Sequence, residues 1–312
     1  MSLFKKKKPE DNYDSISGDG THAVSHFNLA DAIMMAIIAL LCCTCIFPFL
    51  HIIAKSFSSN AAVASQQVAF WPVDFNLQAY DSILKDGRMT YSIIYSACVT
   101  VVFAILGVVV TICAAYPLTK KDLPFRPILS FLLMFPMYFG AGLIPTYLLY
   151  NQYKMLDTVW VLILPLIFSP YNMLVMKSFL QSSIPVSLEE SAFLDGAGYF
   201  RILFKIVLPL SKPIIATLLL FYAVGRWNAY GDNMYYIKLN EKLKMIQYLL
   251  YQMVTSANEA QTIAFAEGSA QNTNPEVIQA SAIMVTTMPI LVVYPFVQKH
   301  FVKGAMIGSV KG

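Results

Sequence analysis

The chain has 312 residues, of which 57% are hydrophobic and only 13% are charged, and its formal net charge is +4. An ordinary soluble domain carries roughly 25% charged residues, so soluble enzymes, disordered chains and fibrous proteins are excluded. The small positive charge gives no basis for nucleic acid binding. The apolar residues stand in long uncharged blocks, which is the pattern of an integral membrane protein that crosses the bilayer several times.

The N-terminal 27 residues are polar and contain four consecutive lysines, Lys5 to Lys8. A cleaved signal peptide is the alternative, but the apolar block that follows is longer than the roughly 7–15 residues of such a signal. We therefore expect residues 1–27 to be a basic cytoplasmic segment ahead of an uncleaved membrane anchor.

Six apolar blocks approach the length of about 20 residues that a helix needs to cross a bilayer. They lack the alternation of barrel strands, so each is expected to be a helix. Five of them contain no Asp, Glu, Lys or Arg: residues 32–54, 91–118, 127–153, 158–176 and 277–297. The remaining block, residues 213–225, reaches full length only by continuing through Arg226, whose guanidinium is expected to snorkel to the interface.

The basic residues set the orientation, because Lys and Arg concentrate in cytoplasmic loops. With the N-terminus inside, the cytoplasmic segments receive most of the 22 Lys and Arg, although the two long loops lie outside. The prediction is an all-α membrane protein with six transmembrane helices over residues 28–300. Both termini are cytoplasmic, and residues 301–312 form a cytoplasmic tail.

The five cysteines all fall inside apolar blocks and have no His or carboxylate at the spacing of a metal site. A metal or redox cluster at residues 42–45 is the less favoured interpretation. We interpret the cysteines as small packing residues, and we expect this chain to bind no metal or other cofactor.

The predicted spans also lack the chemistry of several transporter and enzyme classes. Proton-coupled carriers place ionisable residues inside their helices, whereas here only His51 and Arg226 occur, near the outer ends. The chain has no phosphate-binding Gly-x-x-x-x-Gly-Lys-Ser/Thr loop and no His-Glu-x-x-His helix. Energy for uphill transport would have to come from another subunit.

The loop between the fourth and fifth blocks, about residues 178–212, is the most informative segment. Ser187 and Glu190 have the spacing of a capping box, which predicts a short helix that begins at Ser187. Leu188 and Ala192 would form the apolar stripe of that helix.

Two glycines then predict the end of this helix. Gly196 and Gly198 suit the left-handed backbone at a helix C-terminus, and a second helix is expected from Tyr199 to Pro209. The exposed apolar stripe could dock a soluble partner or rest on lipid as an interfacial helix. The pattern alone leaves these two interpretations open.

The spacing of this loop resembles a known motif. The run Glu190-Ser191-Ala192 is followed by Gly196 after three residues and by Ile206 after nine more. It resembles the "EAA" loop of ABC-importer permeases, with Ser191 where the family has Ala. The Asp-Gly-Ala run at 195–197 resembles the form common in sugar importers.

From Phe57 to the C-terminus the chain resembles the maltose-type permease family of carbohydrate ABC importers. The similar segments are Lys177-Ser-Phe-Leu, Pro209-Leu-Ser-Lys-Pro, Arg226-Trp-Asn and the ending at 301–312. One departure is Tyr91-Ser92, where the family has Asn-Ser or Asn-Thr.

This resemblance implies a non-enzymatic permease subunit of an ATP-driven importer of a carbohydrate, such as an oligosaccharide, in the cell membrane. The implied partners are a second similar permease, two cytoplasmic ATPases that carry ATP and Mg²⁺, and an extracellular solute-binding protein. The implied coupling residues are Leu188, Glu190, Ser191, Ala192, Asp195 and Gly196. In these, Glu190 is a polar anchor, Leu188 and Ala192 are buried knobs, and Gly196 is the turn.

A sugar path would use aromatic faces with amide and hydroxyl partners. The candidates are Tyr138, Tyr147, Tyr150, Tyr171, Asn172, Trp227 and Asn228. Their alternative role is packing or membrane-interface anchoring. The alternative function is an ion-coupled or facilitative carrier that works without an ATPase. Such a carrier is expected to show internal repeats, and the two halves show no such symmetry.

Overall fold

The computed structural model describes residues 29–85, 87–267 and 275–309, and in those ranges every regular element is helical. The chain divides into two units, residues 1–49 and residues 50–312. The predicted basic segment 1–27 lies outside the described residues. The helical fold class is therefore confirmed for the part of the chain that the structure describes.

The first predicted span is a single helix, α1 (Leu29–Ser56). The part of this helix that is long and apolar enough to cross a membrane, Asp31–Ser56, has a mean hydropathy of 2.6. No residue of its most apolar stretch is buried inside the protein. Exposed apolar side chains over such a length suit a helix surrounded by lipid. This helix crosses the boundary between the two units at Phe49.

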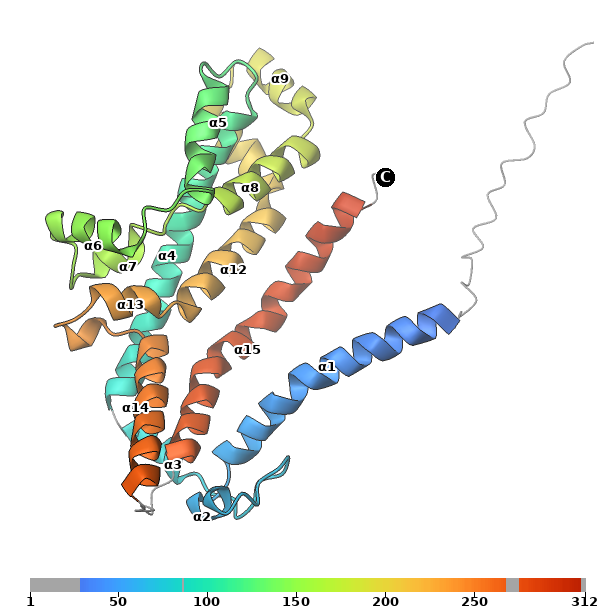
Figure 1. The fold of residues 1–312 in the computed structure, drawn as a ribbon. Coiled ribbons are helices and arrows are strands. Elements are labelled where there is room, and N and C mark those ends of the chain that lie inside the picture. The colour runs from blue at the N-terminus through green and yellow to red at the C-terminus, as the bar shows by residue number, and fades with distance from the viewer. Residues whose placement is uncertain (1–28, 86, 268–274, 310–312) are drawn as a thin grey trace, which may run out of the picture. The chain divides into compact units, whose positions relative to one another are not determined.

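The second unit is organised around α4 (Gly87–Thr119), the second predicted span. It packs against α8 (Pro170–Ser183) and α12 (Lys212–Asn228), and α12 packs against α15 (Pro275–Ser309) (Figure 1). The buried residues Phe103, Met176 and Leu218 belong to the core between these helices. The sixth predicted span is the first part of α15.

Helices α4 and α12 approach closely at Gly107. A Cβ atom there would lie 2.9 Å from the ring of Tyr222. The Tyr222 hydroxyl is 2.7 Å from Thr111 Oγ1 and accepts a hydrogen bond from the Ser169 amide at 3.2 Å. One tyrosine therefore joins α4, α12 and the N-terminus of α8.

The prediction of continuous helices over residues 127–153 and 158–176 is wrong. The first range contains α5 (Arg126–Met134), the 3-10 turn η1 (Phe135–Met137) and α6 (Leu143–Gln152). The second contains α7 (Val159–Ile163) and the start of α8. Gly142, at φ +84°, ends one interruption; Pro165 stands in the other, and Pro170 is the first residue of α8. Glycine and proline break helices in this way because of backbone freedom and a missing N–H.

The fifth block forms α12, and the helix continues through Arg226 to Asn228 as expected. Residues Tyr199–Leu210 precede it at an angle of 80°. In the described residues, three helices are long and apolar enough to cross a membrane, or four if this bent pair counts as one. Six crossings remain a proposal.

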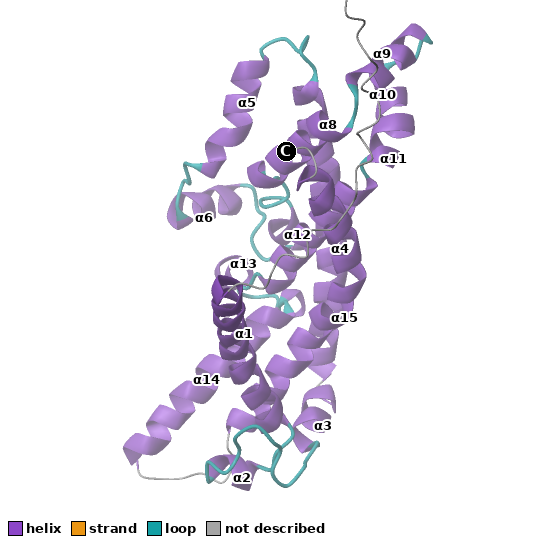
Figure 2. Ribbon diagram, turned by 90° about the vertical axis from the view of Figure 1, so that its right-hand side faces the viewer, coloured by secondary structure: helices purple, strands orange, loops and turns teal. Residues whose placement is uncertain are grey.

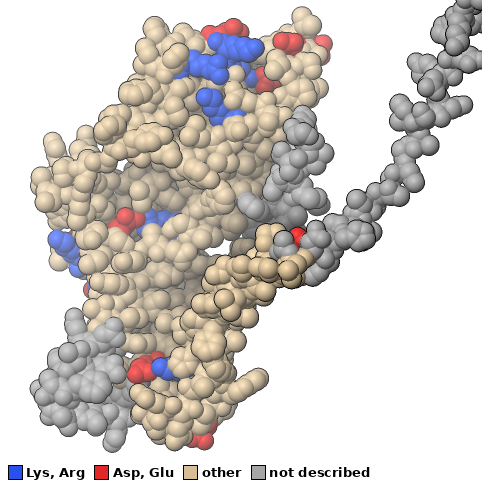
Figure 3. Space-filling model, turned by 45° about the vertical axis from the view of Figure 1, so that its right-hand side comes forward, with Lys and Arg blue, Asp and Glu red and all other residues tan. Residues whose placement is uncertain are grey.

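Several segments predicted on the same side of the membrane lie at the same end of the second unit. The start of α5 and helix α9 (Val186–Leu194) lie at one end (Figures 1 and 2). Helices α2 (Asn60–Ala64) and α3 (Gln78–Lys85) lie at the other, with the end of α14 (Ile246–Glu267). Figure 3 shows Lys and Arg side chains concentrated at the end with α5 and α9. This separation agrees with the loop assignment from the basic residues.

At its C-terminus, α15 continues as one helix to Ser309. The predicted tail 301–312 therefore begins as helix, and its last three residues lie outside the described residues.

Candidate functional site

The loop predicted to dock a partner contains two helices, as expected, but the first begins earlier than the capping box predicts. Helix α9 starts at Val186, and its N-cap is Pro185, which makes no side-chain cap hydrogen bond. Ser187 therefore lies inside the first turn, where its carbonyl accepts a hydrogen bond from Ser191 Oγ at 2.9 Å. Proline is favourable ahead of this turn because its missing N–H has no partner there to lose.

The end of α9 is the predicted glycine turn. Gly196 has φ +78°, and its amide donates to the Phe193 carbonyl at 3.0 Å. The next amide, of Ala197, donates to the Ala192 carbonyl at 2.9 Å. These two bonds form a Schellman motif, which fixes the direction in which the chain leaves the helix.

Gly198 plays a different part. Its φ is −77°, in the extended region, and it is the N-cap of α10 (Tyr199–Ile202). The second helix then runs to Leu210, one residue past the predicted end, through the π-helical segment η2 (Leu203–Val207) and α11 (Leu208–Leu210). Widening of the helix just before Pro209 accommodates a residue that cannot donate a hydrogen bond.

The outer surface of this coupling segment (residues 185–211) is apolar. Leu188 is 45% exposed, Leu194 90% and Phe200 79%. Glu190 and Asp195 are also exposed. Ala192 differs from the prediction, because it is half-buried and packs against the core of its own chain. The structure therefore places Leu188 and Leu194 outward and Ala192 inward.

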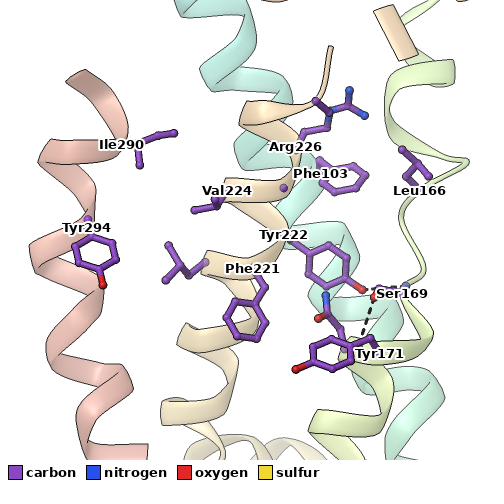
Figure 4. Close-up of a pocket in the computed structure, with 14 residues that line it drawn as sticks. Phe103, Leu166, Ser169, Tyr171, Phe221, Tyr222, Val224, Arg226, Ile290 and Tyr294 are labelled. Carbon is purple, nitrogen blue, oxygen red and sulfur yellow. Dashed lines mark hydrogen bonds between the residues drawn. The ribbon is translucent and has the colours of Figure 1, made fainter. Parts of the chain in front are cut away.

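A second candidate site is a groove of about 810 Å³ between α8, α12 and α15. In Figure 4, Phe221 of α12 stands between Tyr294 of α15 and Tyr171 of α8. The polar groups at the groove include Asn172 and the Tyr222 hydroxyl. We call this the aromatic groove; it has the aromatic faces and hydrogen-bonding partners that a sugar would need.

Only two of the seven predicted path residues, Tyr171 and Asn172, line this groove. Tyr147 and Tyr150 instead pack on Tyr236, with ring centroids 6.4 and 5.1 Å away. Tyr138 is exposed in the break after η1. These side chains form no common site with the aromatic groove.

The pair that ends α12 has packing contacts instead. Trp227 is buried, and its Nε1 donates to the Thr286 carbonyl of α15 at 3.2 Å. Asn228 Nδ2 donates to the Val224 carbonyl within the same helix at 3.0 Å. The sequence missed Phe221, Tyr222 and Tyr294, because only the approach of three helices far apart in the chain brings these residues to one groove.

Arg226 does not snorkel, contrary to expectation. It is 2% exposed, and its Nη1 donates to the Leu162 carbonyl at 2.9 Å and to Asp232 Oδ2 at 2.8 Å. Helix α13 (Gly231–Tyr236), which follows α12 in the chain and contacts α7, supplies this carboxylate. A buried charge requires such a partner, and the sequence could not show that one was within reach.

Between α6 and α7, Asp157 organises a loop. Its Oδ1 accepts the amides of Lys238, Leu239 and Asn240 at 2.6, 2.8 and 3.4 Å. Burial acts to raise the pKa of Asp157, but these hydrogen bonds outweigh it and the pKa is lowered.

Comparison with known proteins agrees with this architecture. Residues 104–307 match the family described as "Binding-protein-dependent transport system inner membrane component". The chain is 41% identical over 285 residues to the polygalacturonan/rhamnogalacturonan transport system permease protein YtcP of Bacillus subtilis (strain 168). This match covers 91% of this chain and 99% of that protein. It is also 41% identical over 269 residues to Protein LplC of the same organism, covering 86% and 90%.

A solved structure is similar as well. It belongs to a bacterial ABC transporter involved in the import of the acidic polysaccharide alginate. The match has a TM-score of 0.74 and 29% sequence identity, and it covers 88% of this chain and 99% of the other. The chain therefore belongs to the binding-protein-dependent inner membrane components, the permease subunits of ABC importers, and it is a transport subunit rather than an enzyme.

Proposed function

We propose that this chain is one of two permease subunits in a carbohydrate importer, with six crossings of the cell membrane and both termini in the cytoplasm. A solute-binding protein delivers the cargo outside, and two cytoplasmic ATPases bind and hydrolyse ATP with Mg²⁺. The observation that carries this proposal is the coupling segment, whose exposed apolar side chains Leu188, Leu194 and Phe200 suit burial against a soluble partner.

In this proposal the coupling segment moves as one rigid body. Closure of the ATPase dimer moves the two segments of the two permeases together, and α9 carries the movement into the membrane helices. Leu188 and Leu194 are buried in the ATPase, while Glu190 anchors the rim and Gly196 fixes the angle between the two short helices. Ala192 supports α9 from below, where it packs on the core.

The cargo proposed is an oligosaccharide that passes along the aromatic groove. Tyr171, Phe221 and Tyr294 offer ring faces, and Asn172 offers an amide. The named cargo of the relative at 41% identity makes fragments of polygalacturonan or rhamnogalacturonan the first to test. A neutral alternative is raffinose, since a relative at 25% identity is named as a melibiose/raffinose/stachyose import permease.

The test is reconstitution in lipid vesicles of the chain with its partner permease, the ATPases and the binding protein. We expect uptake of labelled oligogalacturonide only with ATP and the binding protein, and none by the chain alone. Uptake by the chain alone, driven by a gradient of the sugar or of an ion, would instead establish a carrier. Uptake of raffinose but not of oligogalacturonide would reject the proposed acidic cargo and leave the proposed importer function standing.

A further inference from the structure

A mostly buried ion pair connects the coupling segment to the central helix. Lys120 follows directly after the end of α4, and its Nζ contacts Glu189 Oε2 in the first half of α9. The two residues are 69 positions apart in the chain. Their side chains are only 18% and 16% exposed.

The lysine is held from a second side. Its Nζ lies 4.2 Å from the ring centroid of Tyr116 in the last turn of α4. A cation over an aromatic face is attracted to the ring, more strongly where water is partly excluded. The ammonium therefore rests between an aromatic ring of α4 and a carboxylate of α9.

The end of α4 around this lysine is firmly fixed. The Thr119 hydroxyl donates to the Tyr116 carbonyl at 2.6 Å, and Arg126 Nε donates to the Leu118 carbonyl at 2.9 Å. Leu118 itself is buried in the core. A force applied to Lys120 thus reaches a helix end that has little freedom to yield.

Helix α9, which carries Glu189, combines an exposed outer surface with the contact between Glu189 and Lys120. Leu188 and Glu190, on either side of Glu189, are exposed. Ala192, three residues after Glu189, packs on the core. The same short helix therefore presents one side to the solvent and is fastened by the other side to α4.

We propose that Lys120 and Glu189 are positioning residues that tie α9 to α4, so that movement of the coupling segment is transmitted to the central helix. Helix α4 contacts both α8 and α12, which carry the aromatic groove. This inference rests on the proposed docking of α9 on the ATPase. Loss of the pair would leave docking possible but would let α9 move without α4, so ATP would be hydrolysed with less transport.

The test compares Lys120→Met and Glu189→Gln with Lys121→Met in the complete reconstituted importer. Lys121 is the neighbouring, exposed lysine, so its variant controls for loss of one positive charge at this end. The measurement is the number of ATP molecules hydrolysed per sugar imported, together with the amount of assembled complex. We expect this ratio to rise roughly fivefold or more in the first two variants and to stay at the wild-type value in the control.

The charge-swapped double variant Lys120→Glu/Glu189→Lys should restore the ratio toward wild type. An unchanged ratio in Lys120→Met, or a swapped variant that assembles but stays as uncoupled as the single variants, overturns the proposal. If neither the single nor the swapped variants assemble, the deciding variant is Lys120→Arg, which keeps the positive charge. The proposal requires its ratio of ATP hydrolysed to sugar imported to be near normal, and a rise of roughly fivefold or more rejects the proposal. A wild-type importer without ATP-dependent uptake would reject the proposed function itself, whatever the variants do.

Discussion

At the scale of single residues, Gly196 sets the geometry of the coupling segment through its backbone alone. No atom lies within 4 Å of where its Cβ would stand, but its φ is +78°. Valine at this angle costs on the order of 1–3 kcal/mol, so Gly196→Val should redirect the second short helix. We expect the variant to insert into the membrane normally and to lose most ATP-dependent uptake.

Gly198→Val is the matched control for this prediction. Gly198 also has open space around it, but its φ of −77° is accessible to valine. Uptake should therefore remain near normal. Equal uptake in the two variants would show that the left-handed turn does not position the segment.

Asp157 leads to a prediction about pH. A carboxyl group whose pKa is lowered in the folded state stabilises that state above its ordinary pKa, here 3.8, and this stability is lost as the pH falls through the lowered value. The amides of Leu239 and Asn240 should therefore be protected at about pH 6 and lose protection as the pH falls below 3.8.

Hydrogen exchange followed by mass spectrometry, corrected for the intrinsic rates, measures this protection. Asp157→Asn removes the charge at every pH and should exchange faster at residues 238–240 already near neutrality. Protection that is the same for both proteins at about pH 6 would mean that backbone packing, rather than the carboxylate, holds the loop.

Local residue chemistry was predictable from the sequence only where it depends on the residue's own backbone. Gly196 is such a case, because a left-handed turn favours glycine. The role predicted for Ser187 as N-cap is not such a case, because Pro185 is the N-cap and the helix already begins at Val186. The pairing of Arg226 with Asp232, and of Lys120 with Glu189, depends on how separate helices approach, which no local pattern encodes.

At the scale of helices, the closest approach in the core gives a test of packing. Gly107→Ala would place a Cβ 2.9 Å from the Tyr222 ring, which two hydrogen bonds hold in place. Overpacking of this kind costs typically about 1–3 kcal/mol. We expect a lower melting temperature of the purified protein in detergent.

Gly225→Ala, in α12, is the comparison, since no atom lies within 4 Å of the added methyl group. Alanine favours a helix by up to about 1 kcal/mol over glycine, so this variant should melt at the same or a higher temperature. A Gly107→Ala protein as stable as wild type would show that α4 and α12 can separate without loss.

Helix position was more predictable than helix continuity. The apolar blocks gave the location of α1, α4, α12 and α15, because composition alone decides which segments leave water. The same composition hid the breaks between α5 and α6 and between α7 and α8. Tertiary contacts decide whether a proline or glycine bends a membrane helix or interrupts it.

At the scale of the whole chain, the predicted cytoplasmic segments at the start of α5 and at α9 lie at the opposite end of the second unit from α2, α3 and the end of α14, which are predicted to lie outside. Assignment of the coupling segment to the cytoplasm follows from the basic residues and can be tested directly. In a variant without its native cysteines, Asn240→Cys and Ser65→Cys should react with a membrane-impermeant thiol reagent added to intact cells. Gly198→Cys should react only after the membrane is opened. Reaction of Gly198→Cys in intact cells would reverse the orientation.

The interrupted helices also bear on how the chain enters the bilayer during synthesis. Helix α5 has 9 residues, α6 has 10 and α7 has 5, all shorter than the about 20 that a single crossing requires. Their unpaired backbone ends would be costly in lipid. Such pieces cannot leave the translocon one at a time as α1 can. Helix α4 precedes them in the chain and contacts α7, whereas α8, which contacts both α4 and η1, follows them. We therefore expect these short helices to enter the bilayer together with α4 and α8 rather than singly.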